Sequence, residues 1–265
     1  MDYDNAIEQL VEWALKNAVV RGVILTGSGS TGETHPLSDR DVEIYTTDPA
    51  TLLSDDSWWA RLGEVLVVER LDMPGWHPSR LVYYVGGKLD LTVIPAAAIS
   101  EVPRQRPFTV LLDKDNAAAH REPDEVIGLH PSESDFDERL NWAYAAALMC
   151  AKAIARDEPW SSKIRDRDLK HSLLVMIEWD HRARYGLEFD VRFLGSGMRQ
   201  WMDRGVQDAL EKCWARFDSD DSERALLATV ALFAALSTRV AVTLRFAPFD
   251  HERVSAEIAA VLSSR

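Results

Sequence analysis

The pattern of hydrophobic and polar positions changes once along the chain, near residue 131. Before that point, short apolar or alternating runs recur, which is typical of β-strands. A helix capped by Asp4 is predicted first, over residues 5–19. The strands that we expect after it span residues 21–26, 41–46, 64–70, 79–85, 88–94 and 108–112.

After residue 131, apolar residues recur every three or four positions, as in amphipathic helices. The pattern predicts helices over residues 134–156, 165–185, 205–216, 221–243 and 252–263. Residues 116–131 are polar and contain two prolines, which indicates a linker. The predicted fold class is therefore α/β (α+β), with two domains. Residues 1–130 form an N-terminal domain with a mixed sheet, and residues 131–265 form a C-terminal helical bundle.

A glycine- and serine-rich turn, Gly27-Ser28-Gly29-Ser30-Thr31-Gly32, follows the first predicted strand. Such a turn brings backbone N–H groups and hydroxyls close to phosphate oxygens, because glycine lacks the side chain that would block the approach. It is not a Walker loop, since no Gly-Lys-Ser/Thr follows at the required spacing. Taken alone, the composition also fits an ordinary flexible turn.

Two aspartates, Asp39 and Asp41, stand at the start of the next predicted strand. Residues i and i+2 of a strand point to the same side, so the two carboxylates would emerge together. Carboxylates held close repel one another unless a cation or a proton lies between them. A magnesium ion suits this site, since it prefers oxygen ligands and keeps water or substrate phosphates as the others. A solvated turn with a capping aspartate is the alternative.

Together, Gly27-Ser28 and Ser38-Asp39-Arg40-Asp41-Val42 resemble the signature of the DNA polymerase beta-type nucleotidyltransferases. The resemblance implies ATP as co-substrate and two Mg²⁺ ions. It also implies a nucleotide-binding turn with Gly27, Ser28 and Ser30, and a metal-holding pair of aspartates. One departure is Gly29, where many members have arginine.

A third carboxylate, Asp90, lies in the predicted strand 88–94. There Leu89, Leu91 and Val93 share one face of the strand, and Asp90 lies on the other. An aspartate on a core strand has to be paired or bound to something. The resemblance implies a third acid on a neighbouring strand, so Asp39, Asp41 and Asp90 are the predicted catalytic and metal-binding residues.

A narrower resemblance comes from the order and spacing of the segments 88–95, 110–115 and 176–179, which are similar to those of the aminoglycoside 6-adenylyltransferases. It implies transfer of AMP from Mg-ATP to a hydroxyl of an aminoglycoside, at the 6-hydroxyl of streptomycin, and hence antibiotic resistance. Where that family tends to show Gly-Lys-x-x-Lys, this chain has Gly195-Ser196-Gly197-Met198-Arg199. This departure concerns either how the phosphates are bound or which substrate the protein uses.

In the helical half, the resemblance implies a basic residue at the position of Lys152. We expect Lys152 to bind the triphosphate. A lysine that only extends its ammonium out of a buried helix is the alternative. Glu178, Trp179 and Asp180 are the expected acceptor-binding residues, because acids meet ammonium or guanidinium groups through charge-assisted hydrogen bonds. Helix surface charge and a core tryptophan are the alternative for this trio.

Composition agrees with a cationic partner. With 30 Lys and Arg against 43 Asp and Glu, the formal net charge is −13. This charge disfavours nucleic-acid binding and would attract an aminoglycoside, although solubility alone also explains it. The two cysteines are expected to be reduced core residues, and Trp58, Trp59, Trp76 and Trp142 to lie in the core or in cleft walls.

No membrane partner is expected. The first residues lack the basic and apolar regions of a signal peptide, and residues 237–239 interrupt the apolar stretch 225–244. A buried core helix and a cytoplasmic location are therefore predicted. Two alternatives for the function stay open: a nucleotidyltransferase acting on a lincosamide, a metabolite or a protein hydroxyl, and a non-catalytic nucleotide- or drug-binding relative.

Overall fold

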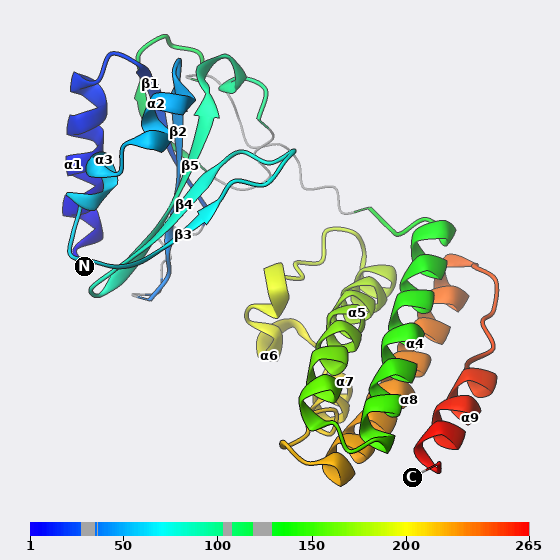
Figure 1. The fold of residues 1–265 in the computed structure, drawn as a ribbon. Coiled ribbons are helices and arrows are strands. Elements are labelled where there is room, and N and C mark those ends of the chain that lie inside the picture. The colour runs from blue at the N-terminus through cyan, green and yellow to red at the C-terminus, as the bar shows by residue number, and fades with distance from the viewer. Residues whose placement is uncertain (28–34, 36, 103–107, 119–128, 265) are drawn as a thin grey trace. The chain divides into compact units, whose positions relative to one another are not determined.

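The computed structural model describes residues 1–27, 35, 37–102, 108–118 and 129–264. The chain divides into two compact units, Met1–Val126 and Ile127–Arg265 (Figure 1). The first unit contains a sheet and a few helices, and the second is helical. This architecture confirms the predicted fold class.

A six-stranded mixed sheet forms the first unit, with the strand order β3-β4-β5-β2-β1-β6. The strands are β1 (Val20–Thr26), β2 (Arg40–Thr46), β3 (Val65–Leu71), β4 (Ser79–Tyr84), β5 (Gly87–Pro95) and β6 (Thr109–Asp113). Strands β2 and β5 pair in parallel, and the other neighbours are antiparallel. All six predicted strands are present within two residues of their expected ends.

The predicted strands 79–85 and 88–94 leave Gly86 and Gly87 as the turn between them, and the structure differs from this by one residue. Tyr84 pairs with Gly87, so the two-residue turn consists of Val85 and Gly86 rather than of the two glycines. Gly86 has φ +80°, a conformation that glycine adopts readily. Gly87 is the first residue of β5.

Three helices of the first unit, α1 (Tyr3–Lys16), α2 (Pro49–Ser54) and α3 (Ser57–Ala60), lie on one face of the sheet (Figure 1). Helix α1 starts earlier than predicted, because Asp2 rather than Asp4 accepts the capping hydrogen bond, from the backbone N–H of Asn5. It also ends earlier, at Lys16, with Asn17 as its C-cap. The short helices α2 and α3 were not predicted individually. Their buried side chains, with those of α1, cover the alternate residues of β2 and β5 that include Leu89, Leu91 and Val93.

The opposite face of the sheet carries a smaller apolar cluster. Ile24, Tyr45 and Ile94 pack there against Ile99, which follows the short 3₁₀ helix η2 (Ala96–Ala98). Asp41 of β2 and Lys88 and Asp90 of β5 lie on this second face, because side chains alternate along a strand. This position sets the acids apart from the helix-covered core.

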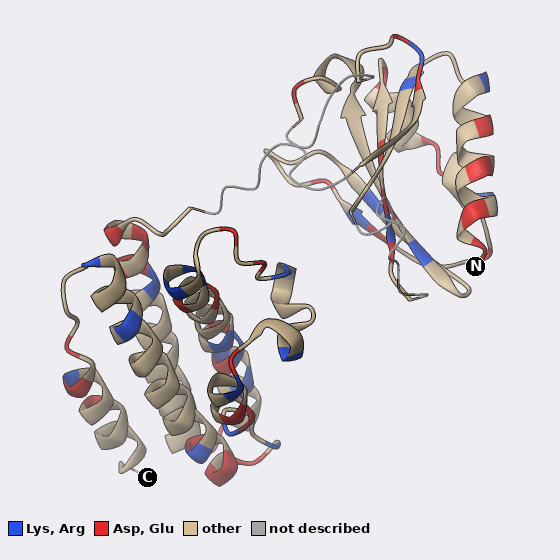
Figure 2. Ribbon diagram, turned by 180° about the vertical axis from the view of Figure 1, so that it is seen from behind, with Lys and Arg blue, Asp and Glu red and all other residues tan. Residues whose placement is uncertain are grey.

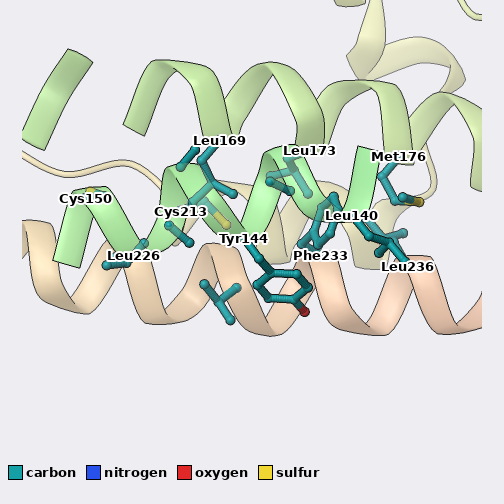
Figure 3. Packing of buried hydrophobic residues seen from close by; sticks show 14 of the residues in the cluster. Leu140, Tyr144, Cys150, Leu169, Leu173, Met176, Cys213, Leu226, Phe233 and Leu236 are labelled. Carbon is teal, nitrogen blue, oxygen red and sulfur yellow. The ribbon is translucent and has the colours of Figure 1, made fainter. Parts of the chain in front are cut away.

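The second unit is a bundle of α4 (Glu133–Ala155), α5 (Pro159–Tyr185), α8 (Ser219–Leu244) and α9 (His251–Leu262). Shorter elements, η3 (Phe193–Gly195), α6 (Met198–Trp201) and α7 (Arg204–Glu211), connect α5 to α8. Figure 3 shows Leu140, Tyr144, Leu173 and Phe233 among the side chains packed between the long helices. Helix α5 begins six residues before its predicted start, since Pro159 is well suited to the first turn of a helix.

Among the described residues, α8 is the one helix long and apolar enough to cross a membrane. Its buried residues, which include Leu226, Phe233 and Leu236, lie in the apolar core of the bundle (Figure 3). A core helix passes the same test of length and composition. The packing therefore accounts for its apolar sequence.

The cysteines and tryptophans divide by environment. Cys150 and Cys213 are buried free thiols, and burial raises the pKa of Cys150 to about 12, as expected of inert core residues. Trp58 and Trp59 are buried, whereas Trp76 is 75% exposed. The prediction was therefore wrong for Trp76, which lies in the turn between β3 and β4.

Candidate active site

Two of the three predicted acids face each other across the parallel strands. Asp41 of β2 is the register partner of Asp90 of β5. In each strand the next residue, Val42 or Leu91, belongs to the core under the helices, so both aspartates lie on the opposite face of the sheet. The alternating sequence of the two strands therefore brings Asp41 and Asp90 together.

Asp39 completes the group through a lysine. It lies just before β2, and its Oδ2 accepts a hydrogen bond of 2.9 Å from Lys88 Nζ. The same ammonium donates to Asp90 Oδ2 at 2.9 Å and lies 2.8 Å from Asp90 Oδ1. Lys88 thus connects Asp39 to Asp90 from a position two residues before Asp90 on β5.

Arg40 supports the backbone that presents Asp39. Its Nη1 donates to the carbonyl oxygens of Ser38 at 2.9 Å and of Asp39 at 3.3 Å. The guanidinium also lies 4.3 Å from the centroid of the Tyr3 ring, in cation–π geometry. Arg40 is therefore bound on both sides, and it holds the turn before β2 against α1.

Burial affects the charge of this group. The pKa of Asp90 is raised, because burial disfavours its charged form more than Lys88 favours it. Burial also opposes the charge of Lys88, but hydrogen bonds to Asp90 and Asp39 outweigh it and raise the lysine pKa. Asp90 Oδ1 is buried and accepts no hydrogen bond, although it is close to the lysine. This oxygen is therefore held by the charge of Lys88 rather than by a hydrogen bond.

Gly27, the first residue of the predicted nucleotide turn, approaches Asp41 closely. It has φ +69°, and a Cβ atom built on it would lie 2.5 Å from Asp41 Oδ2. The neighbouring Thr26 pairs with Asp41 in the sheet. The backbone conformation favours glycine here, and a larger residue would also displace the carboxylate of Asp41. Ser28 and Ser30 lie outside the described residues.

A pocket of about 310 Å³ adjoins this group within the first unit. Its walls include Asp39, Lys88, Tyr3 and Tyr83. Sequence reasoning singled out neither of the tyrosines nor Lys88. The signal for Lys88 was available in Lys88-Leu89-Asp90, because the alternation that exposes Asp90 on the second face places Lys88 beside it.

The chemistry of these side chains fits a divalent cation. In the described part of the chain, no three acidic, histidine or cysteine side chains already form a metal cluster. Asp39, Asp41 and Asp90 nevertheless supply carboxylate oxygens, the ligand type that magnesium prefers. Asp90 Oδ1 lacks a hydrogen-bond donor, and a lysine already provides a positive charge between two of the acids.

The predicted residues of the helical unit have separate environments. Lys152 is exposed in the last turn of α4, where a cation also interacts favourably with the helix dipole. Glu178 is half-buried, and burial raises its pKa despite the opposing effect of Arg182. Trp179 is half-buried against the bundle core.

Asp180, in contrast, is buried and paired with arginines of the bundle. It is 1% exposed, and its carboxylate accepts hydrogen bonds from Arg184 Nη2 at 2.7 Å and from Arg239 Nε and Nη2 at 2.9 Å. Both oxygens are used within the bundle. These contacts account for its charge, so Asp180 is not among the acceptor-binding residues proposed below.

A second pocket, of about 480 Å³, lies in the helical unit beside Trp179. Trp142, Glu138 and Arg139 of α4 contribute to its walls, together with Asp135 and residues 129–131. Trp142 is 64% exposed, so it is a pocket wall rather than a core residue. Arg139 Nε is buried without a hydrogen-bond partner. Sequence reasoning missed Glu138 and Arg139, since charges on a helix surface carry no distinct signal.

Comparisons with known proteins agree over nearly the whole chain. An aminoglycoside 6-adenylyltransferase of Campylobacter jejuni is 24% identical over 261 residues, which cover 93% of this chain and 91% of the relative. One of Bacillus subtilis (strain 168) is 21% identical over 258 residues, with 91% of each chain covered. A crystal structure of an aminoglycoside 6-adenyltransferase from Bacillus subtilis superimposes with a TM-score of 0.50, at 21% identity and 97% coverage of both chains.

The structural likeness shows the fold, and the family follows from the sequence. The model of the family described as streptomycin adenylyltransferase matches residues 2–260. The chain therefore belongs to the streptomycin adenylyltransferase family and is a nucleotidyltransferase enzyme.

Proposed function

We propose that this enzyme transfers AMP from ATP to a hydroxyl of an aminoglycoside, and that the acceptor is the 6-hydroxyl of streptomycin. The observation that carries the proposal is the pairing of Asp41 with Asp90, joined by Asp39 through Lys88. The family of the chain and the names of its relatives support the class of acceptor. A cytoplasmic location, where ATP is available, is part of the same proposal.

Asp39, Asp41 and Asp90 would hold the two magnesium ions that the family implies. When bound, such ions neutralise phosphate charge and lower the pKa of an acceptor hydroxyl. Asp90 accepts the proton of this hydroxyl, directly or through a water molecule. The hydroxyl oxygen then bonds to the α-phosphorus while the bond to the bridging oxygen breaks and pyrophosphate leaves.

The remaining predicted residues bind the two substrates. Gly27, with Ser28 and Ser30 of the same turn, contacts the phosphates through backbone N–H groups and hydroxyls. Lys152 offsets the charge of the leaving pyrophosphate. Glu178 and Trp179 bind the cationic acceptor through charge and ring contacts.

The overall charge is consistent with such an acceptor. Figure 2 shows Asp and Glu on the helices of both units, and the formal net charge is −13. This field attracts a polycation and disfavours nucleic acid. The acidic residues are spread widely, so charge alone does not locate the acceptor.

A different acceptor is the second candidate. Residues 195–199, where the resemblance led us to expect two lysines, contain a single basic residue, Arg199, which is exposed at α6. The same chemistry on a lincosamide, a metabolite or a protein hydroxyl would use the same carboxylates. A non-catalytic relative is disfavoured, because all three acids are retained.

Pyrophosphate release from Mg-ATP tests the proposal, with streptomycin, other aminoglycosides and a lincosamide as separate acceptors. The Asp41→Asn protein is the blank. Release with streptomycin alone is expected, and the mass and NMR spectrum of the product should locate AMP on the 6-hydroxyl. Release only with another acceptor, or AMP on another hydroxyl, would contradict the proposed specificity.

A further inference from the structure

Lys88 occupies the position between Asp39 and Asp90 where a cation is needed. Its Nζ lies 2.9 Å from Asp39 Oδ2 and 2.8 Å from Asp90 Oδ1. The lysine side chain is 15% exposed, against 42% for Asp39 and 24% for Asp90. Two carboxylates this close repel each other without a positive charge, and Lys88 supplies it in this structure.

The backbone of Lys88 is fixed, whereas its side chain has room to move. Its backbone N–H donates to Tyr3 Oη at 2.9 Å, and a Cβ atom on Gly87 would lie 2.8 Å from the same oxygen. The ammonium is 5.3 Å from the centroid of the Tyr83 ring. Lys88 also lines the pocket of about 310 Å³ beside Tyr3 and Tyr83, and rotation of its four-carbon stem would carry Nζ into that space.

We propose that Lys88 is an internal counter-ion of the carboxylate site, which leaves its position between Asp39 and Asp90 when a divalent cation binds. The proposal rests on the proposed function, in which these acids are metal ligands. An ammonium between the two acids and a metal ion at the same position repel each other and compete for the carboxylate oxygens. Lys88 therefore keeps the acids in place before the metal binds and lowers the apparent affinity for the metal.

Manganese binding in the absence of ATP and acceptor tests this competition, with free Mn²⁺ followed by EPR. The Lys88→Met protein removes the ammonium and keeps the apolar stem. We expect its Kd for Mn²⁺ to fall about tenfold, within the range usual for coupled binding equilibria. Without metal, the Tm of Lys88→Met should be lower than that of the wild type, because the carboxylates repel each other. Saturating Mn²⁺ should raise the Tm of the variant by more than it raises the Tm of the wild type.

Lys114→Met is the matched control. Lys114 is a half-buried lysine of the same unit, but its Nζ donates to the carbonyl oxygens of Ala14 at 2.7 Å and Asn17 at 2.8 Å. Its loss should lower the Tm and leave the Kd for Mn²⁺ unchanged. If Lys88→Met behaved in the same way, or bound Mn²⁺ more weakly, the proposal would be wrong.

A second measurement uses the wild-type protein and does not depend on the folding of a variant. Reductive methylation of Lys88, followed by mass spectrometry of its peptide, should become several-fold faster when Mg²⁺ is added, with the Lys114 peptide as reference. An unchanged or slower rate at Lys88 would contradict its release. Neither measurement involves AMP transfer, so failure here is distinguishable from failure of the proposed enzymatic function.

Discussion

The α/β unit and the helical unit each contain a largely buried carboxylate. The two carboxylates differ in how many of their oxygens accept hydrogen bonds. Asp180 of the bundle is 1% exposed, and arginines occupy both of its oxygens. Asp90 of the sheet is 24% exposed and holds Lys88, but its buried Oδ1 accepts no hydrogen bond. A carboxylate whose oxygens all accept hydrogen bonds stabilises the fold, whereas a carboxylate held by one lysine at the edge of a pocket can exchange that lysine for a cation.

Backbone geometry explains why the sequence places the acids of the first unit on one face but does not place residues 178–180 on one face in the second. In a strand, alternate residues share a face, so Asp41 and Asp90 could be assigned to the same side of the sheet. In a helix, consecutive residues are rotated by about 100°. Glu178, Trp179 and Asp180 therefore cannot share one face, and Asp180 turns into the bundle.

The largest effect that tests this comparison is expected from Asp90→Asn. Turnover should fall by about 100-fold or more, because charge stabilisation at the reacting phosphate is lost. The free energy of unfolding should be unchanged or higher, since burial already disfavours the charged form of Asp90. Steady-state kinetics and urea denaturation measure the two quantities.

Glu43→Gln is the control for this substitution. Glu43 lies on the same face of β2 as Asp41, and its Oε2 accepts a hydrogen bond of 2.7 Å from Tyr45. Glutamine keeps an oxygen that can accept this bond, so turnover should change little. Near wild-type turnover of Asp90→Asn would remove Asp90 from the catalytic group.

Asp180→Asn should show the reverse behaviour. We expect the free energy of unfolding to fall by about 3 kcal/mol, because Arg184 and Arg239 lose a shared buried partner. The partial exposure of both arginines keeps this value at the lower end of the usual range. The kcat of the folded protein should stay close to that of the wild type. A stable protein with a raised KM for streptomycin would instead return Asp180 to the acceptor site.

Much of the fold was predictable because local periodicity determined it. All six strands and the long bundle helices carry a clear period of hydrophobic residues. The missed elements, α2, α3 and α6, are four to six residues long, too short for a helical period to be visible. Helix ends were less accurate, as at α1, where Asp2 and Asp4 are both plausible caps and only Asp2 reaches a free N–H.

The site was predictable as far as its residues lie on strands with a recognisable motif. Strand alternation places Asp41, Lys88 and Asp90 on one face of the sheet, but the pairing of Asp41 with Asp90 and the bridge from Lys88 to Asp39 also require the register of β2 with β5. The pairing is between strands that are distant in sequence. The pocket at Trp142 and Arg139 was missed for a similar reason, because it is formed by segments from two helices and a loop.

Gly27→Ala tests how closely Gly27 and the proposed metal ligand Asp41 are coupled. Alanine at φ +69° costs about 1 kcal/mol. The added Cβ would lie 2.5 Å from Asp41 Oδ2 and would displace that oxygen. We therefore expect turnover to fall about tenfold, since small misplacements of catalytic groups are costly. Gly75→Ala is the matched control, because Gly75 has φ +82° and no atom within 4 Å of the added Cβ. Equal turnover in the two variants would show that Asp41 tolerates the side chain.

The smallest effect concerns the pH dependence of the bundle. His251 is half-buried, and this burial lowers its pKa despite the opposing charge of Asp250. Its Nδ1 shares a hydrogen bond of 2.6 Å with the Tyr144 hydroxyl. Because the unfolded chain binds the proton more tightly, the stabilising contribution of neutral His251 is present above the ordinary histidine pKa of about 6.5 and is lost as the pH falls below it.

The free energy of unfolding should therefore decrease between pH 7.5 and 5.5 more steeply in the wild type than in His251→Gln, as measured by urea denaturation at each pH. Glutamine retains a hydrogen-bond partner for Tyr144 and does not titrate in this range. His171→Gln, at an exposed position of α5, should keep the wild-type slope. A slope that is the same in all three proteins would mean that His251 does not determine the pH dependence of the bundle.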